Sequence, residues 1–266
     1  MRAFVLLRVV AAGCFAVALQ AQEQKPRTPV LVELFTSEGC SSCPPADTLL
    51  ARLLHEQPFD GAQIIALGEH VNYWDGLGWH DRFSSAQFTA RQTQYSARFH
   101  LDSIYTPQMV VDGAAQFVGN DQGQARRSIA EASRAVKLPL VISAVEIEGR
   151  KFSASVSAAS AGAEGEVFAA LVDPMDTTDV RNGENGGRRL NHVSVVRTLV
   201  RIGSTRDVAG KTLSFSITAP AASTPETMQL VVFAQSAELG RVIGIAVADT
   251  QDKQHNVEQS MLAHSR

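Results

Sequence analysis

The first part of the chain alternates short apolar runs with stretches of helical periodicity. A β-branched and aromatic run at residues 30–35 and an apolar run at 64–67 each predict a buried strand. Leucines at helical spacing predict a helix from about Ser42 to His55 between them. A second helix, capped by Ser84 or Ser85, would share one apolar face among the aromatic residues Phe88, Tyr95 and Phe99.

A hairpin and a further helix follow. Strands at 109–111 and 116–118 are joined by Asp112-Gly113, and this dipeptide tolerates the positive φ angles of a tight turn. A helix over 121–136 would place Ala125, Ile129, Ala132 and Val136 on its apolar side. The predicted order is strand, helix, strand, helix, strand, strand, helix, which is typical of an α/β domain.

The pattern changes near residue 138. From there to residue 249, short apolar runs are separated by Gly, Ser, Thr, Asn and Pro, without a long helical period. Short strands at this density predict an all-β, sandwich-like fold. The runs lie at 141–147, 167–172, 193–202, 213–217, 230–233 and 242–247. We therefore expect an α/β domain over 30–137, a β-sandwich-like domain over 138–250 and a polar tail over 251–266.

The N-terminal residues 1–21 have the pattern of a secretory signal peptide. Arg2 and Arg8 precede an uncharged apolar run at 9–19, and small residues offer cleavage after Ala18 or Ala21. The run is shorter than the roughly 20 apolar residues of a membrane span. A lipoprotein signal ending at Cys14 is the less favoured alternative. We expect an exported, periplasmic or secreted protein, with a polar linker at 22–29 and no transmembrane span after cleavage.

The charge balance and the cysteine content exclude some classes of function. The 266 residues hold 24 Lys and Arg against 27 Asp and Glu, a net charge of -3. This balance supplies no strong basic field, so we do not expect nucleic acid as a partner. Of three cysteines, signal cleavage removes one, and Cys40 and Cys43 remain in a compartment where disulfides persist.

The remaining cysteines form a Cys-Ser-Ser-Cys motif between a predicted strand and helix. Backbone N–H groups at a helix N-terminus stabilise a thiolate, so Cys40 is the expected nucleophile and Cys43 the resolving thiol. An inert disulfide and half of a zinc site are the alternatives. A disulfide across so short a loop contributes little stability, and neither a second Cys-x-x-Cys nor a His-x-x-x-His is present, so redox chemistry is favoured.

An aromatic segment follows the second strand. Tyr73, Trp74 and Trp79 lie in residues 72–81, past the strand's carboxyl end, where open α/β sheets bind ligands. They predict either a lid or substrate platform beside Cys40, or an anchor for a long loop. His70 is a candidate for tuning the thiol, although a structural role is more common for such a residue. Glu38 and Asp47 are expected to be solvated or helix-start charges, and Glu38 is a candidate for raising the thiol pKa by like-charge repulsion. The Gly-rich loop at 181–189 is expected to join two strands.

Several motifs resemble known proteins. Cys40-Ser41-Ser42-Cys43 at the first strand–helix junction and Thr106-Pro107 before the third strand resemble the thioredoxin-like superfamily. The resemblance implies a cis Pro107 facing the cysteines and a client-contacting Thr106. The residues 34–47, 70–75, 105–108 and 183–185, with His192 and Arg197, resemble more closely a family of exported bacterial proteins of unknown function.

These features predict a thiol-disulfide oxidoreductase acting on the thiols or disulfides of exported proteins, without a cofactor. Cys40, Cys43 and Pro107 are its predicted catalytic residues. Thr106, Tyr73, Trp74 and His70 are predicted to bind the client. The alternatives are a non-enzymatic exported binding protein with a structural disulfide, and a copper-handling protein that uses Cys40, Cys43 and His70.

Overall fold

A computed structural model describes residues 27–160 and 162–249. The predicted signal peptide and polar tail and most of the linker lie outside these residues. The first part contains β1 (Thr28–Thr36), α1 (Pro44–Glu56), β2 (Ala62–His70), α2 (Ala86–Arg98), β3 (Gln108–Val111), β4 (Ala115–Val118) and α3 (Gln122–Ala132). The second part contains β5 (Leu140–Glu148), β6 (Lys151–Ala158), β7 (Glu166–Asp179), β8 (Arg189–Ser204), α4 (Thr205–Val208), β9 (Thr212–Thr218), β10 (Gln229–Gln235) and β11 (Val242–Asp249), with a 3-10 turn at Pro225–Thr227.

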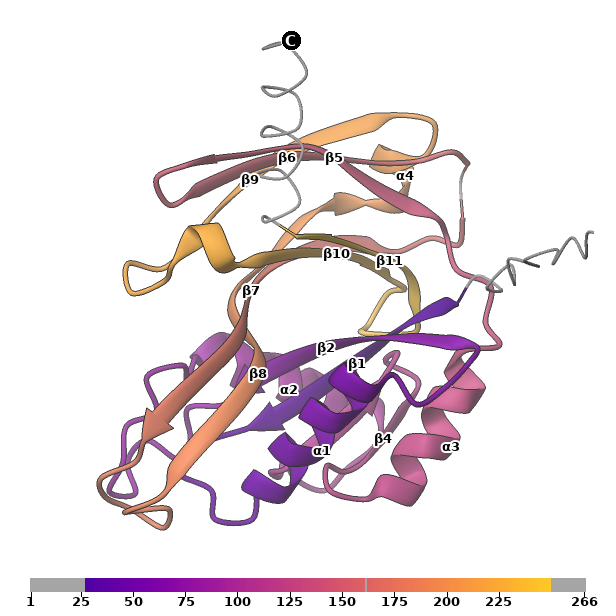
Figure 1. The fold of residues 1–266 in the computed structure, drawn as a ribbon. Coiled ribbons are helices and arrows are strands. Elements are labelled where there is room, and N and C mark those ends of the chain that lie inside the picture. The colour runs from indigo at the N-terminus through magenta and orange to yellow at the C-terminus, as the bar shows by residue number, and fades with distance from the viewer. Residues whose placement is uncertain (1–26, 161, 250–266) are drawn as a thin grey trace, which may run out of the picture.

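The strands form two sheets of a mixed α/β protein. The larger has eight strands in the order β11-β10-β7-β8-β2-β1-β3-β4, and the smaller has three antiparallel strands in the order β5-β6-β9. Figure 1 shows the small sheet as an outer layer over β10 and β11. A core of buried residues from β5, β6, β7, β9 and β10 joins these layers. The small antiparallel sheet therefore packs on strands of the large sheet.

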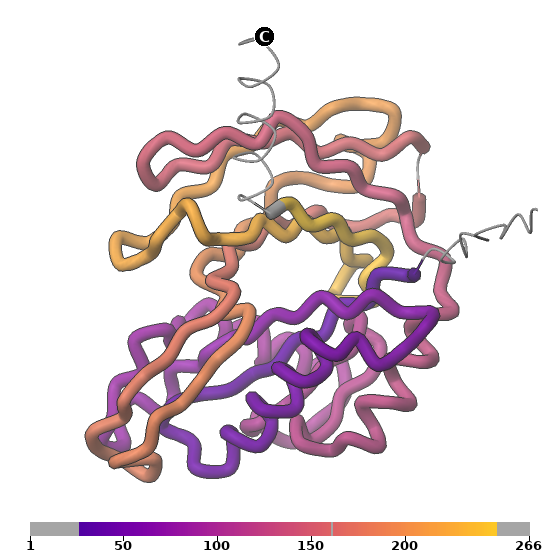
Figure 2. Tube along the Cα trace, viewed as in Figure 1, coloured from indigo at the N-terminus to yellow at the C-terminus, as the bar shows by residue number. Residues whose placement is uncertain are grey.

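The predicted separation of the two parts is not reflected in the sheet. The long strands β7 and β8 extend from the upper layer to the first part of the chain (Figures 1 and 2). There β8 meets β2 through the pair Gly68 and Val195. Hydrophobic patterning marks strands but does not specify which strands pair across a long sequence separation, so this continuity was not predicted.

Helices cover both faces of the β1–β4 region. Buried side chains of α1 and α3 pack on one face, and Phe88 and Tyr95 of α2 pack on the other. Ser85 caps α2 as predicted, because its hydroxyl accepts a hydrogen bond from the Gln87 N–H at 3.2 Å. The turn residues Asp112 and Gly113 have φ angles of 51° and 61°, as a hairpin of this kind requires.

Two helix boundaries differ from the predictions. Helix α1 begins at Pro44 rather than near Ser42, because its first residues are prolines, which need no acceptor for an N–H group. Helix α3 ends at Ala132, and Val136 beyond it is 97% exposed, so it does not belong to the apolar face. No helix within the described ranges combines the length and apolar character that crossing a bilayer requires.

Candidate functional site

Cys40 and Cys43 form a disulfide at the junction of β1 and α1. Their Cα atoms are 5.4 Å apart, and Cys43 is the N-cap of α1. The Cys40 Sγ lies 3.3 Å from the Ser42 hydroxyl. Pro44 and Pro45 occupy the first helical positions, where an N–H group has no intrahelical acceptor. The predicted cysteine pair is therefore present, and it is placed at the start of a helix.

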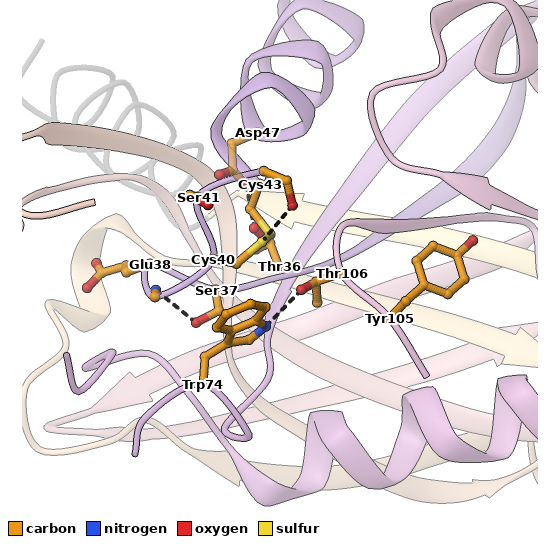
Figure 3. Close-up of a disulfide and its surroundings, with 12 residues drawn as sticks. Thr36, Ser37, Glu38, Cys40, Ser41, Cys43, Asp47, Trp74, Tyr105 and Thr106 are labelled. Carbon is orange, nitrogen blue, oxygen red and sulfur yellow. Dashed lines mark hydrogen bonds between the residues drawn. A yellow bond between two sulfur atoms is a disulfide. The ribbon is translucent and has the colours of Figure 1, made fainter. Parts of the chain in front are cut away.

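Two further loops meet the disulfide, as Figure 3 shows. The Trp74 indole donates a hydrogen bond of 2.8 Å to the Thr106 hydroxyl. The Thr106-Pro107 peptide bond is cis, as the resemblance implied. A Cβ atom at Gly39 would lie 3.0 Å from the Trp74 Cβ, so this close approach requires glycine. Tyr73 lies beside Trp74, with ring centroids 6.4 Å apart.

The disulfide is fully covered. Cys40 and Cys43 both have 0% exposure. Besides Trp74, the loop at 180–188 between β7 and β8 reaches the cysteine motif from the second part of the chain. The Asn185 amide donates hydrogen bonds of 2.9 Å to the carbonyl oxygens of Glu38 and Cys40. The Glu184 carboxylate accepts a bond of 3.1 Å from the Ser41 N–H. A client can reach the sulfur atoms only if this cover moves.

Buried ionisable groups lie behind the cysteine motif. We call Glu38, Asp47, His70, Asp81 and His192 the carboxylate–histidine cluster; all five are buried. His70 Nδ1 lies 2.7 Å from the Asp81 carboxylate, which also accepts a bond from the Glu38 N–H. Burial lowers the pKa of His70, but Asp81, Asp47 and Glu38 together raise it more, so the net pKa is raised. Burial raises the pKa of Asp81, but His70 and hydrogen bonds lower it to about 2. The two therefore form an ion pair.

His192 stands between two carboxylates of this cluster. Its Nε2 lies 3.6 Å from Glu38 and its Nδ1 4.0 Å from Asp47, and neither ring nitrogen has a hydrogen-bond partner. The His192 and His70 rings are 4.7 Å apart. Burial raises the pKa of Asp47 more than the two histidines lower it.

Asp47 lies in the first turn of α1, as one of the two predicted alternatives has it, but neither Asp47 nor Glu38 is exposed to solvent. Trp79 donates a hydrogen bond of 2.7 Å to Glu38, and Thr36 donates one of 2.9 Å to Asp47. These contacts come from loops and strand ends distant in sequence, so local patterning did not predict them. His192 and Asn185 were likewise not selected as site residues, although both belong to the motifs that carried the family resemblance.

Other features of the described residues bear on metal and ligand binding. The loop at 181–189 joins two strands, as predicted. Strand β7 carries three aspartates spaced three residues apart, and Asp173, Asp176 and Asp179 each lie beside an arginine rather than around a common centre. Within the described residues, no group of three or more His, Cys, Asp or Glu side chains is arranged to hold a metal ion. A cavity of about 570 Å³ between β2 and β10 is lined by residues such as Gln63, Ile65 and Val231, and by none of the predicted site residues.

The fold and site define an α/β protein with a covered Cys-x-x-Cys disulfide at a strand–helix junction. The chain belongs to the DUF1223 family, described as proteins of unknown function, whose model matches residues 31–235. The crystal structure of protein AGR_C_4864 from Agrobacterium tumefaciens is similar, with 24% identity and a TM-score of 0.66 over 85% of this chain and 96% of that one. At this identity the similarity shows the fold alone.

Two other comparisons add nothing to the assignment. A β-glucosidase from Kluyveromyces marxianus matches with 10% identity and a TM-score of 0.20, over 59% of this chain and 16% of that one, and carries no argument. The comparison with curated proteins gives no match.

Proposed function

We propose that this protein is a thiol-disulfide oxidoreductase with a thioredoxin-like first part, acting on exported proteins. The observation that carries the proposal is the Cys40–Cys43 disulfide at the start of α1, next to Thr106 and Trp74. The strand–helix order and the cis Thr106-Pro107 bond support the thioredoxin-like assignment. The predicted export depends on the signal peptide at residues 1–21 and its cleavage near Ala18 or Ala21.

The exchange proceeds in two steps in the reduced protein. The Cys40 thiolate attacks one sulfur of a client disulfide, forms a mixed disulfide and releases the other client sulfur as a thiolate. The Cys43 thiolate then attacks the Cys40 sulfur, which releases the second client sulfur and forms the Cys40–Cys43 disulfide. Two electrons pass to the client, and the reverse sequence oxidises a client dithiol.

Cys43 must lose a proton before it attacks. Asp47 lies next to Cys43 in Figure 3, one helical turn into α1. Its raised pKa makes it a suitable proton acceptor in a buried setting. We assign the Cys43 proton to Asp47, with His192 as the neighbouring group that stabilises the charge.

Client binding is assigned to the loops beside the disulfide. Thr106 and the Pro107 backbone would orient an extended client segment, and Tyr73 and Trp74 would contact its side chains. His70 was predicted to bind the client, but it is 1% exposed and paired with Asp81. We therefore assign His70 to charge balance behind the cysteines.

Trapping tests the proposal. The Cys43→Ser variant, exposed to oxidised glutathione and to insulin as a model disulfide protein, should accumulate a mixed disulfide through Cys40. The Cys40→Ser variant is the matched control and should accumulate none. In the reduced wild type, iodoacetamide should label Cys40 at mildly acidic pH and leave Cys43 unlabelled. Slow, equal labelling of both cysteines, without a trapped adduct, would contradict the proposal.

A second candidate function is favoured by the complete burial of both cysteines. It is a non-enzymatic binding protein in which the disulfide is a fixed element of the fold. This candidate predicts that millimolar glutathione leaves the disulfide intact and that the Cys40→Ser variant remains functional. The oxidoreductase proposal predicts reversible reduction under the same conditions.

A further inference from the structure

The loop at 180–188 is held together by its own backbone hydrogen bonds. Backbone hydrogen bonds close it internally: Gly186 N–H to Gly183 O, Gly187 N–H to Val180 O, and Arg188 N–H to Asn185 O. Gly183 and Gly187 have φ angles of 76° and 80°, which favour glycine. Its stem is the β7–β8 pair, which continues into the large sheet. A displacement at the stem would therefore carry the whole loop.

The loop contacts the redox motif almost entirely through main-chain groups of the motif. Asn185 bonds the carbonyl oxygens of Glu38 and Cys40, and Arg188 holds the Asn185 amide in place with a bond of 2.8 Å. Glu184 takes the Ser41 N–H. Gly183 packs against Trp79, because a Cβ there would lie 3.1 Å from the Trp79 Cβ. Thus one side chain of the loop brings a carboxylate to the residue that follows Cys40.

This carboxylate is ionised at neutral pH. Hydrogen bonds from the Ser41 hydroxyl and the Ser41 backbone N–H lower the pKa of Glu184 below its ordinary value. Glu184 is exposed, so solvent moderates its charge without removing it. In the disulfide form the neighbouring sulfur is uncharged, and the Ser41 N–H is available to Glu184.

Reduction of the disulfide changes the charge next to Glu184. A donor dithiol transfers two electrons and becomes a disulfide; one of its protons goes to Cys43 and the other to solvent, so Cys40 is left as a thiolate and Cys43 as a thiol. The new negative charge repels the Glu184 carboxylate, and the backbone N–H groups near the helix start are the groups that stabilise such a thiolate. The thiolate and Glu184 therefore compete for the same donors.

We infer that Glu184 couples the position of the loop to the redox state of the cysteines: the loop closes over the disulfide and is released when the disulfide is reduced. This inference rests on the proposed function, because it requires a reducible pair. Coupling is reciprocal, so the closed loop must also favour the disulfide over the dithiol. Glu184 acts as a positioning residue, and the site would be open in a larger fraction of reduced molecules than of oxidised ones.

The first part of the test measures the equilibrium with glutathione. Glu184→Gln removes the charge and keeps the size of the side chain, so it should shift the equilibrium toward the dithiol by roughly three- to tenfold, the size expected for one nearby charge in a solvent-rich setting. Glu184→Asp should keep most of the wild-type equilibrium. Asp179→Asn, which removes an exposed carboxylate at the end of β7, is the control and should match the wild type.

The second part measures loop opening. Hydrogen–deuterium exchange of the amides in residues 180–188 should be faster in the reduced wild type than in the oxidised one. The difference should shrink in Glu184→Gln, while the β5–β6 hairpin serves as an internal reference. The inference would be overturned, and the proposed function left standing, by an unchanged glutathione equilibrium in Glu184→Gln. The same holds if hydrogen–deuterium exchange in the loop is equal in the reduced and oxidised protein. A disulfide that dithiothreitol cannot reduce in the folded protein would overturn the proposed function as well.

Discussion

Asn185→Ala should make the covered disulfide easier to reduce. The Asn185 side chain is fully buried, and its amide donates to two carbonyl oxygens of the cysteine motif, those of Glu38 and Cys40. Alanine removes both bonds at once and also the oxygen that accepts a bond from Arg188. The closed loop then retains the Glu184 contact and the packing of Gly183 on Trp79. The substitution thus weakens closure without touching either sulfur atom.

The size of the effect follows from the two bonds. A hydrogen bond within a protein contributes a net 0.5–1.5 kcal/mol, roughly, so the loss of two costs the closed state about 1–3 kcal/mol. In the open state water reaches both carbonyl groups, so the open state has no comparable loss. The population of the open loop should therefore rise by about 5- to 150-fold. If opening precedes attack on the disulfide, the reduction rate rises by the same factor.

The assay is the second-order rate constant for reduction by dithiothreitol, followed by alkylation of the free thiols and mass spectrometry. Asn182→Ala is the matched control, because Asn182 lies in the same loop and its side chain is exposed. We expect the control to react at the wild-type rate. Equal rates for wild type, Asn182→Ala and Asn185→Ala would refute the reasoning, since the loop would then not limit access.

Three further predictions concern the buried charges. Burial and the neighbouring Glu33 raise the pKa of Glu69 well above its ordinary value, although Arg91 lowers it. The folded protein therefore keeps a proton on Glu69 that the unfolded chain loses above about pH 4.5. Because of this difference, the stability of the folded state should fall as pH rises above that value. Glu69→Gln should therefore match the wild type near pH 4 and melt higher at pH 8, with about 2–4 °C for each kcal/mol regained. Asp81→Asn should lower the pKa of His70 in an NMR titration. It should also lower the free energy of unfolding in urea at pH 6 by about 3–5 kcal/mol, because His70 loses its buried partner. An unchanged His70 titration would contradict the pairing. The Lys137 ammonium donates hydrogen bonds to the Asp112 carboxylate and the Val242 carbonyl, both at 2.5 Å, and so connects the β3–β4 turn to β11. Lys137→Met should lower the free energy of unfolding by a similar 3–5 kcal/mol, roughly. Tryptophan fluorescence and far-ultraviolet circular dichroism should still report one transition, because we expect the shared sheet to unfold as a unit.

Most of the elements were predictable because their signals are local. The seven elements of the first part follow from period, caps and the Asp112-Gly113 turn. Strand β6 was not predicted, although its buried positions alternate regularly. Two of these positions are Ala154 and Ala158, whose small side chains give a weak hydrophobic signal beside the intervening serines. The pairing of β8 with β2 has no local signal at all, because it joins residues more than a hundred positions apart.

The candidate site was likewise predictable only where its signals are local. The cysteine motif and Thr106-Pro107 are short motifs with a known geometry, and they meet Trp74 as expected. The cover was not predictable, since Asn185 and Cys40 lie 145 residues apart and meet only through the continuous sheet. The burial of Asp47 and His192 follows from that same sheet, which places β8 against α1. Motif reading therefore located the cysteine pair, whereas the residues that cover it are brought there by tertiary structure.

The equilibrium reduction potential of the Cys40–Cys43 pair tests the account most directly. Equilibration with glutathione and with dithiothreitol buffers, quenched by acid and alkylation, gives this value for the folded protein. Catalytic dithiols lie between about -120 and -270 mV, whereas structural disulfides of exported proteins lie below about -300 mV. The account predicts a potential within the catalytic range. A value below about -300 mV would identify a fixed structural disulfide and contradict the account.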